Sequence, residues 1–426
     1  MGEPMVAPES NSLRFEAPHR PAFVRILNEV GRRIEALGLN PFEIDESRIT
    51  AAVEKQTGLH DFGEDLYRQP MRVLIDSFNS EARLNPLGRY FARGFVLAAL
   101  RNRLQLQDWW TRHPEILDQP VVRPIVVIGL PRTGSTLLQN LLAQDLHNRS
   151  LLGWEASFPT PPPERETYLT DPRIRRVEMV SKVVDYLSPA ARGLHPVGAT
   201  MPTECVTLFA NSFGNMDISG INWVPSYLDN WLASDLTPHY RYFKKQLQLL
   251  QWQNPRERWS LKTPAHLFAL DSLLEVFPDA CVVQTHRDPS RVIGSFCSLA
   301  ATLYAIGSDE VDVDALGRAW CEVWAVGLDR TMAFRRKAGE SDQFLDVHYR
   351  DLLADPVGTV HRIYDHFGLE MAKTADTHMR AFMVKNPQHK KGVHRYTLEQ
   401  FGLAAADVER RYAEYCREYG VATGSG

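Results

Sequence analysis

A loop with the spacing of a phosphate-binding site is the first place where this chain could do chemistry. In Gly129-Leu130-Pro131-Arg132-Thr133-Gly134-Ser135-Thr136, two glycines bracket four residues and two hydroxyl side chains follow. Backbone N–H groups in such a loop, together with the positive end of a following helix, surround phosphate oxygens. The ordinary motif carries a lysine after the second glycine. Here Ser135 stands in that place, and the cation, Arg132, lies inside the loop.

The same sequence offers no evident partner for magnesium. A nucleoside triphosphatase would carry an acidic residue at the end of a later strand. In the run CVVQTHRD, Gln284 and Thr285 occupy the positions where that acid would be wanted. We therefore predict that the loop binds a phosphate-like group without a metal ion, and that Arg132 supplies the electrostatic stabilisation.

The elements that must position this loop alternate along the chain. Short apolar runs predict buried strands at 124–130, 259–262, 280–287 and 344–349, and amphipathic runs predict helices at 136–145, 290–306 and 357–369. Strands that alternate with helices indicate a parallel sheet. The predicted fold is therefore α/β, with a P-loop-type parallel sheet flanked by helices.

The remaining segments differ from this domain in composition and in hydrophobic periodicity. Residues 1–20 are polar and rich in proline, and we expect them to be poorly ordered. Residues 21–120 have helical periodicity and predict a helical N-terminal region packed on the core. The α/β domain is expected over 121–415. Within it, 150–255 is rich in proline and aromatic residues and reads as a mostly helical insertion that shapes a substrate pocket.

Three further motifs follow the predicted strands. One is Arg287-Asp288-Pro289, with Ser295 on the next helix; an arginine fork and a nearby hydroxyl suit a phosphate. Another is Leu261-Lys262-Thr263-Pro264, in which a lysine ends a strand. The last is Tyr349 at the end of the fourth predicted strand, and Arg350 follows it.

Taken with the loop, these motifs resemble those of sulfotransferases that use 3′-phosphoadenosine-5′-phosphosulfate (PAPS). The resemblance covers about residues 124–403 and is closest to the bacterial sulfotransferase-like group, related to tyrosylprotein sulfotransferases. Arg350 departs from the family, which usually has an acid there. The resemblance implies a binding role for each motif. The 5′-phosphosulfate is bound by the loop residues Arg132, Thr133, Gly134, Ser135 and Thr136, and the 3′-phosphate by Arg287 and Ser295. Lys262 contacts the sulfonate, Tyr349 lies near the adenine, and the basic loop with Lys391 and Gly392 closes over the nucleotide.

Sulfonate transfer also requires a base for the acceptor hydroxyl, and two glutamates are candidates. Glu155 follows the loop helix, as the catalytic glutamate of tyrosylprotein sulfotransferases does, and we predict it as the base. Glu204 is kept as a positioning residue or alternate base, although an acid at the start of a helix is common. His266 either orients the acceptor or caps the helix after Lys262, and the capping role is preferred.

The predicted function is therefore transfer of a sulfonate from PAPS to a hydroxyl on an unidentified small molecule or peptide. A P-loop nucleotide kinase or hydrolase is the alternative enzyme, which would want the missing lysine and an acid for magnesium. A non-catalytic nucleotide-binding protein on the same fold is the alternative from another class.

Composition limits the other possibilities. The 426 residues carry a formal net charge of -4, which argues against a broad nucleic-acid-binding surface. Five widely spaced cysteines do not predict a disulfide framework and suit a reducing compartment. The N-terminus lacks the pattern of a secretory signal, and no apolar run predicts a membrane span. We expect a soluble, cytoplasmic protein.

Overall fold

A parallel five-stranded sheet lies at the centre of the protein, seen in a computed structural model that describes residues 20–40, 42–187, 198–386 and 396–424. The strand order is β2-β3-β1-β4-β5, and every neighbouring pair is parallel. The strands are β1 (Ile125–Gly129), β2 (Asn148–Ser150), β3 (Arg258–Lys262), β4 (Cys281–His286) and β5 (Phe344–His348). This sheet confirms the predicted α/β fold.

The central strand β1 shows why the sheet needs helices on both faces. All five of its residues are buried. Ile125 and Val127 pack into a cluster on one face of the sheet, whereas Val126 and Ile128 pack into the main core cluster on the other. Alternate side chains of a strand point to opposite faces, so a β-branched run such as this one is stable only between two layers of helices.

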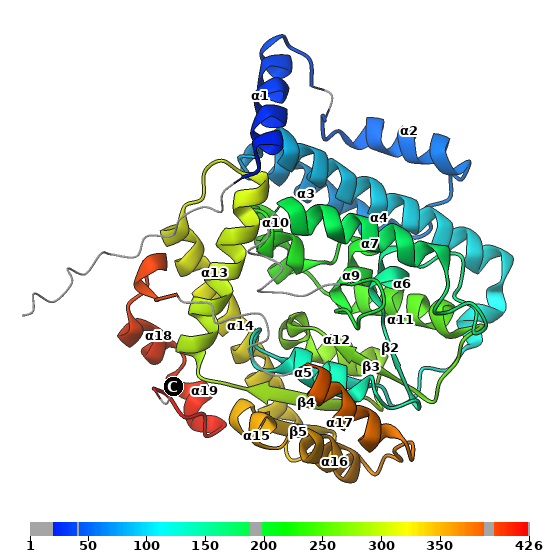
Figure 1. The fold of residues 1–426 in the computed structure, drawn as a ribbon, viewed down its shortest axis with the longest axis vertical. Helices are drawn as coiled ribbons and strands as arrows, with labels where there is room; N and C mark the ends of the chain where they lie inside the picture. The colour runs from blue at the N-terminus through cyan, green and yellow to red at the C-terminus, as the bar shows by residue number, and fades with distance from the viewer. Residues whose placement is uncertain (1–19, 41, 188–197, 387–395, 425–426) are drawn as a thin grey trace, which may run out of the picture.

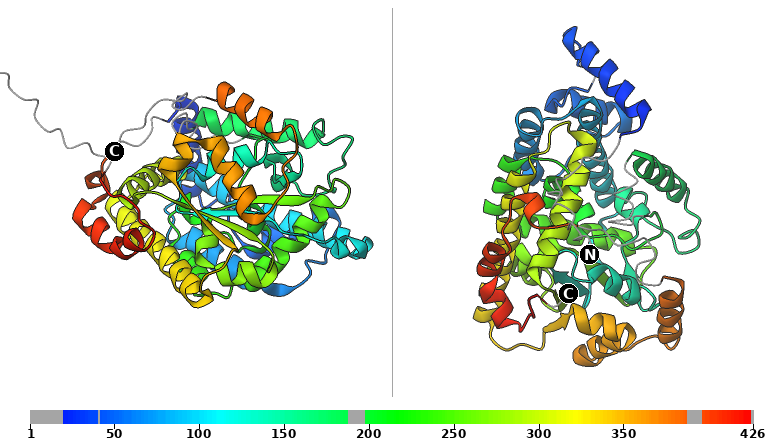
Figure 2. Two further views of the ribbon diagram at one scale, coloured as in Figure 1. Left: turned by 90° about the horizontal axis from the view of Figure 1, so that it is seen from below. Right: turned by 60° about the vertical axis from the view of Figure 1, so that its left-hand side comes forward.

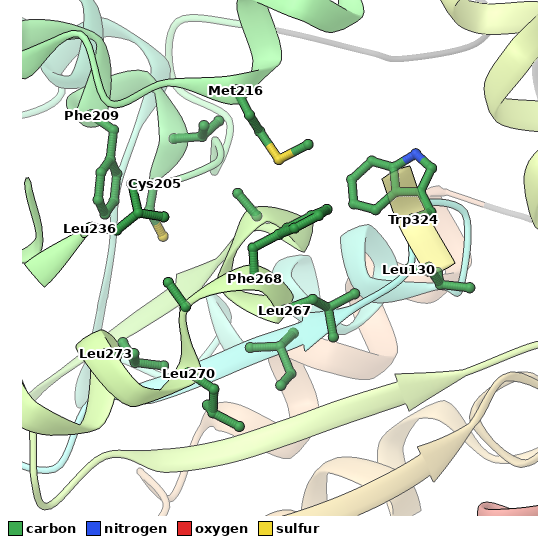
Figure 3. Packing of buried hydrophobic residues seen from close by; sticks show 14 of the residues in the cluster. Leu130, Cys205, Phe209, Met216, Leu236, Leu267, Phe268, Leu270, Leu273 and Trp324 are labelled. Atoms are coloured by element: carbon green, nitrogen blue, oxygen red, sulfur yellow. The ribbon is translucent and has the colours of Figure 1, made fainter. Parts of the chain in front are cut away.

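The two faces are covered by different helices (Figure 1). The cluster around Ile125 and Val127 includes residues from α5 (Ser135–Leu142) and α16 (Pro356–Phe367). The main core cluster joins α11 (Thr237–Gln251), α12 (Leu270–Val276) and α14 (Val313–Ala338) to the opposite face. Figure 3 shows part of this core, in which the rings of Phe268 and Trp324 pack at a tilt of 53° with their centroids 5.6 Å apart, and Met216 lies nearby.

An N-terminal layer of helices lies beyond this core. It consists of α1 (Ala22–Ala36), α2 (Glu46–Thr57), α3 (Arg68–Ser80) and α4 (Pro86–Arg112), and α1 projects at the top of Figure 1. Helices α2, α3 and α4 share a second buried cluster with Phe213 and Tyr227 of the later chain. A Cβ on Gly88 of α4 would lie 2.0 Å from the carbonyl oxygen of Gly307, so glycine is required for this close approach.

Short helices fill the segment predicted as an insertion. They are α6 (Gly153–Ser157), α7 (Pro172–Leu187), α9 (Val206–Phe209) and α10 (Pro225–Ala233), and they lie on the upper side of the sheet in Figure 1. The later chain adds α13 (Pro289–Gly307), α15 (Tyr349–Ala354), α17 (Ala375–Lys385), α18 (Ala405–Arg411) and α19 (Ala413–Glu418).

Among the described residues, α13 is the helix whose length and apolar composition would allow it to cross a bilayer. However, 61% of its apolar window is buried inside the protein. Its residues Val292, Ile293 and Cys297 belong to the main core cluster. Such burial is typical of a core helix in a folded domain.

Candidate active site

The phosphate loop runs from the end of β1 at Gly129 to the start of α5 at Ser135. Arg132 (φ 67°) and Gly134 (φ 85°) both adopt left-handed backbone conformations, and such residues turn successive N–H groups toward one point. A Cβ on Gly134 would lie 3.0 Å from a ring carbon of Tyr349, and one on Gly129 would lie 2.5 Å from the carbonyl oxygen of Thr285. At both positions a side chain would clash with a neighbouring residue, which explains why glycine is needed there.

Thr133 has a different position from the other loop residues. Its side chain is fully buried, donates a hydrogen bond to the carbonyl oxygen of Leu130 at 2.7 Å, and lies 2.6 Å from the hydroxyl of Thr285. This hydroxyl stabilises the loop from behind. By contrast, Ser135 and Thr136 line the cleft in front of the loop, together with Arg132 and Gly134. Thr133 can therefore contact a ligand through its backbone N–H but not through its side chain.

The predicted 3′-phosphate residues meet the loop directly. The Arg132 guanidinium donates from Nε to the hydroxyl of Ser295 at 3.1 Å, and Nη1 of Arg287 donates to the carbonyl oxygen of Arg132 at 2.7 Å. The Arg287 guanidinium lies 4.0 Å from the ring centroid of Tyr349. Burial, with a smaller contribution from Arg287, lowers the pKa of Arg132. The ends of β1, β4 and β5 thus place two cations and an aromatic ring together.

A second polar group lies at the end of β3. The Lys262 ammonium is almost fully buried and forms an ion pair with Glu204, and the hydroxyl of Thr263 donates to Oε2 of Glu204 at 3.2 Å. The backbone holds this arrangement, because the N–H of Cys205 donates to the carbonyl oxygen of Lys262 at 3.0 Å. Both Glu204 and Lys262 line the cleft.

Asp217 is a site residue that the sequence did not reveal. It lies in the short 3-10 segment Met216–Gly220 and lines the same cleft as Glu204 and Lys262. Burial, followed by the negative charge of Glu204, raises the pKa of Asp217 to about 8. A single aspartate in an aromatic-rich segment has no motif around it, so only the folded chain shows that it belongs here.

Glu155, the base predicted from the sequence, lies elsewhere. Its side chain is fully buried and accepts two hydrogen bonds from Arg149, at 2.9 and 2.8 Å. Its Oε1 also accepts from the hydroxyl of Tyr168 and the N–H of Leu152, both at 2.9 Å. Glu155 is not among the residues that line the cleft. The prediction of Glu155 as base is therefore corrected, because a fully buried carboxylate away from the cleft cannot meet a substrate hydroxyl. Glu204, predicted as the alternate base, does line the cleft.

His266 also lies outside the cleft lining. It is fully buried, and its Nδ1 lies 2.6 Å from the hydroxyl of Tyr240. Burial lowers the pKa of His266 to about 3. Because this imidazole is buried outside the cleft lining, the alternative of orienting the acceptor is not supported. The preferred capping role is corrected too, because Thr263 caps the helix after Lys262 by accepting from the N–H of Ala265. Lys391 and Gly392, predicted to close over the nucleotide, lie outside the described residues.

The cleft has two chemically distinct halves and a volume of about 520 Å³. The loop, Arg287, Lys262, Glu204 and Asp217 form a polar half. An apolar half follows, lined by Met216, Ile221, Phe296, Leu299, Ala300, Leu303, Trp320 and Trp324. The cleft can therefore hold both an anion and an apolar group, and it is lined by carboxylates as well.

A parallel sheet with a modified phosphate loop, and cations at the ends of three strands, defines a P-loop group-transfer enzyme. The sequence profile of the sulfotransferase family matches residues 124–373, which is more than half of the chain. The chain therefore belongs to the sulfotransferase family, as its motifs predicted, and is an enzyme of the PAPS-dependent kind.

Solved and curated proteins agree with this placement. A crystal structure of the sulfotransferase STF1 from Mycobacterium tuberculosis H37Rv is 37% identical, covers 87% of this chain and 98% of its own, and superposes with a TM-score of 0.78. STF9 from Mycobacterium avium is 29% identical, covers 89% and 98%, and gives a TM-score of 0.81. The omega-hydroxy-beta-dihydromenaquinone-9 sulfotransferase Stf3 of Mycobacterium bovis is 27% identical over 70% of this chain and 75% of its own.

Proposed function

We propose that this enzyme transfers the sulfonate of PAPS to the hydroxyl of an apolar alcohol, with Glu204 as the general base. The observation that carries the proposal is the position of Glu204. Its carboxylate is ion-paired to Lys262 and lines the same cleft as the phosphate loop and the apolar side chains. A donor bound at the loop and an acceptor bound at the apolar side chains would meet at this residue.

The donor is assigned to the polar half of the cleft. Backbone N–H groups of the loop, with the hydroxyls of Ser135 and Thr136, would hold the 5′-phosphosulfate. Arg287 and Ser295 would hold the 3′-phosphate, and both already contact Arg132. Arginine presents a planar fork of donors that matches phosphate oxygens. Tyr349, beside Arg287, offers a ring for the adenine.

The reaction is a direct displacement at sulfur. The acceptor oxygen forms a bond to sulfur, and the bond from sulfur to the bridging oxygen of the phosphate breaks. Glu204 takes the acceptor proton, and adenosine 3′,5′-bisphosphate leaves with the electron pair. Lys262 and Arg132 stabilise the negative charge that develops on the leaving phosphate, and such stabilisation is strongest in the transition state.

The apolar half of the cleft supports an alcohol with a hydrophobic body. Trp320, Trp324 and Leu303 give that end of the cleft little capacity to hydrogen-bond a sugar or a peptide backbone. The curated relative named above acts on a hydroxylated dihydromenaquinone, according to its name. We assign the acceptor of this chain to the same broad class, an apolar chain that ends in a hydroxyl.

Transfer of labelled sulfonate from PAPS to straight-chain primary alcohols of increasing length tests this function. We expect kcat/KM to rise with each added methylene until the apolar half is filled, by about fourfold per group, since burying a CH₂ contributes about 0.8 kcal/mol. A series of sugars serves as the comparison. Preferred transfer to sugars, or equal transfer to short and long alcohols, would refute the acceptor class.

A further inference from the structure

The outward face of α7 is apolar although no described part of the chain covers it. Met179, Val183 and Tyr186 follow one another at helical spacing along this face, and they are 65%, 50% and 59% exposed. Val180, beside them, is also exposed. Residues three and four apart lie on one side of a helix, so these side chains form a continuous stripe. Exposed contiguous apolar patches of this kind mark interaction sites.

Basic residues border this stripe. Arg175 lies one turn before Met179 and Lys182 one turn before Tyr186, both on the exposed side of the helix. Neither has an ion-pair partner among the residues whose structure is described. Of the two acids of α7, Asp185 lines the cleft, whereas Glu178 is exposed between Arg175 and Lys182. The exposed charges of α7 are therefore Arg175, Arg176 and Lys182 against Glu178, a net positive charge beside the apolar stripe.

The end of α7 lies at the cleft. Asp185 lines the cleft, and Leu187, two residues later, is buried in a small cluster with Val24 of α1 and Leu87 of α4. Ile306 of α13 packs against this cluster, one turn beyond Leu303 of the apolar half of the cleft. Figures 1 and 2 show α7 along the outside of the molecule, with α1 above it in Figure 1.

Helix α1 adds a second exposed apolar stripe beside the first. Phe23, Ile26 and Val30 follow one another at helical spacing, and each is at least half exposed. Because Val24 and Leu187 belong to one buried cluster, α1 adjoins the end of α7. The apolar surface thus extends from one helix to the other around that end of the cleft.

We infer that the outward faces of α7 and α1 bind the surface of an anionic lipid bilayer, from which an apolar acceptor enters the cleft. A helix with an apolar face and flanking lysine and arginine residues lies in the interface of a membrane rather than across it. The net positive charge beside the stripe complements anionic headgroups. A second copy of the chain would bring the same cations together on both sides, which disfavours self-association. The entry of the acceptor rests on the proposed function, whereas the binding of the bilayer does not.

Flotation with vesicles tests the inference. The full chain is mixed with vesicles made of phosphatidylglycerol and phosphatidylcholine in equal parts, or of phosphatidylcholine alone. We expect binding to the first, weaker binding at high salt, and little binding to the second. Met179→Glu with Val183→Glu is expected to lower binding by at least about tenfold, because the charged side chains no longer enter the apolar layer. Arg175→Ala and Lys182→Ala are each expected to lower it by about fivefold.

Val384→Glu on α17 is the matched control, because Val384 is 81% exposed but lies on a different helix. It should bind vesicles as the parent does. Equal losses in Val384→Glu, or absence of binding by the parent chain, would overturn the inference. So would light scattering that shows the α7 glutamates converting a dimer to a monomer. Calorimetry with adenosine 3′,5′-bisphosphate on every variant keeps this result separate from the proposed function, since intact nucleotide binding shows that the cleft is folded.

Discussion

Glu204 and Glu155 are each paired with a cation, but only Glu204 faces the cleft. Glu204→Gln is expected to lower kcat by at least about 100-fold, the lower end of the contribution of a general base. The affinity for adenosine 3′,5′-bisphosphate should change little, because the loop and Arg287 are intact. Turnover with labelled PAPS and calorimetry with the bisphosphate measure the two effects separately.

Glu155→Gln provides the contrast at the residue scale. It leaves the buried Arg149 guanidinium without its carboxylate, and breaking a buried ion pair costs about 3–5 kcal/mol of stability. Urea unfolding should therefore show a lower free energy of unfolding, while kcat per folded molecule stays near that of the parent. A reversed pattern, with activity lost only in Glu155→Gln, would contradict the assignment of the base.

Asp217 predicts a pH dependence of stability. Its pKa is raised from 3.8 to about 8, first by burial and then by Glu204. Between these pH values the folded protein keeps a proton that the unfolded chain has released, so stability falls as the pH rises through this window. Asp217→Asn should be less sensitive to pH. Urea unfolding of both proteins at several pH values checks this, and parallel curves would show that Asp217 ionises normally.

The meeting of Arg132, Ser135 and Arg287 at one cleft could be predicted because they belong to motifs. Arg132 and Ser135 lie on the loop after β1, Arg287 follows β4 directly, and the carboxyl ends of parallel strands meet at one edge. Glu155 was misassigned because sequence distance from the loop says nothing about which way a side chain points. Glu155 is buried together with Arg149, with which it is hydrogen-bonded, and the sequence does not show this pairing.

At the scale of the elements, the junction of the loop and α5 depends on Gly134. An alanine there would adopt a left-handed conformation, at a cost of about 1–2 kcal/mol, and would also press on Tyr349 and Leu352. We expect Gly134→Ala to lower both stability and the affinity for the bisphosphate. Gly58→Ala is the matched control, because Gly58 has φ 70° at the end of α2 and nothing within 4 Å of an added Cβ.

Gly134→Ala should lose at least as much stability as Gly58→Ala in urea unfolding, because its added Cβ also meets Tyr349 and Leu352. Calorimetry should detect weaker nucleotide binding only in Gly134→Ala. Unchanged nucleotide affinity in Gly134→Ala would show that the loop tolerates the shift of Tyr349, and would count against its role in binding.

The strands differ in how clearly the sequence predicts them. The four longer strands were predicted closely in position, helped by β-branched apolar runs such as Ile125–Gly129. The prediction that all four are buried was wrong for β5, where Leu345, Asp346 and His348 are not buried. Strand β2 was missed. Its three residues, Asn148–Ser150, are polar and pair only with β3 at the edge of the sheet. A strand so short carries no alternation to read.

At the scale of the whole molecule, the local clustering of cations matters more for ligand binding than the net charge of the chain. The chain carries a formal net charge of -4, yet Arg132, Lys262 and Arg287 come from three separate segments to one cleft. Such focusing attracts an anionic ligand to a net-acidic protein. We therefore propose that this cleft binds a sulfated adenine nucleotide without a divalent cation.

Titration calorimetry on the full chain in the presence of EDTA tests that claim most directly. Adenosine 3′,5′-bisphosphate should bind at one site per chain, and Arg287→Ala should weaken the binding markedly. The account would be contradicted if the bisphosphate gave no binding heat while ATP bound once magnesium was restored.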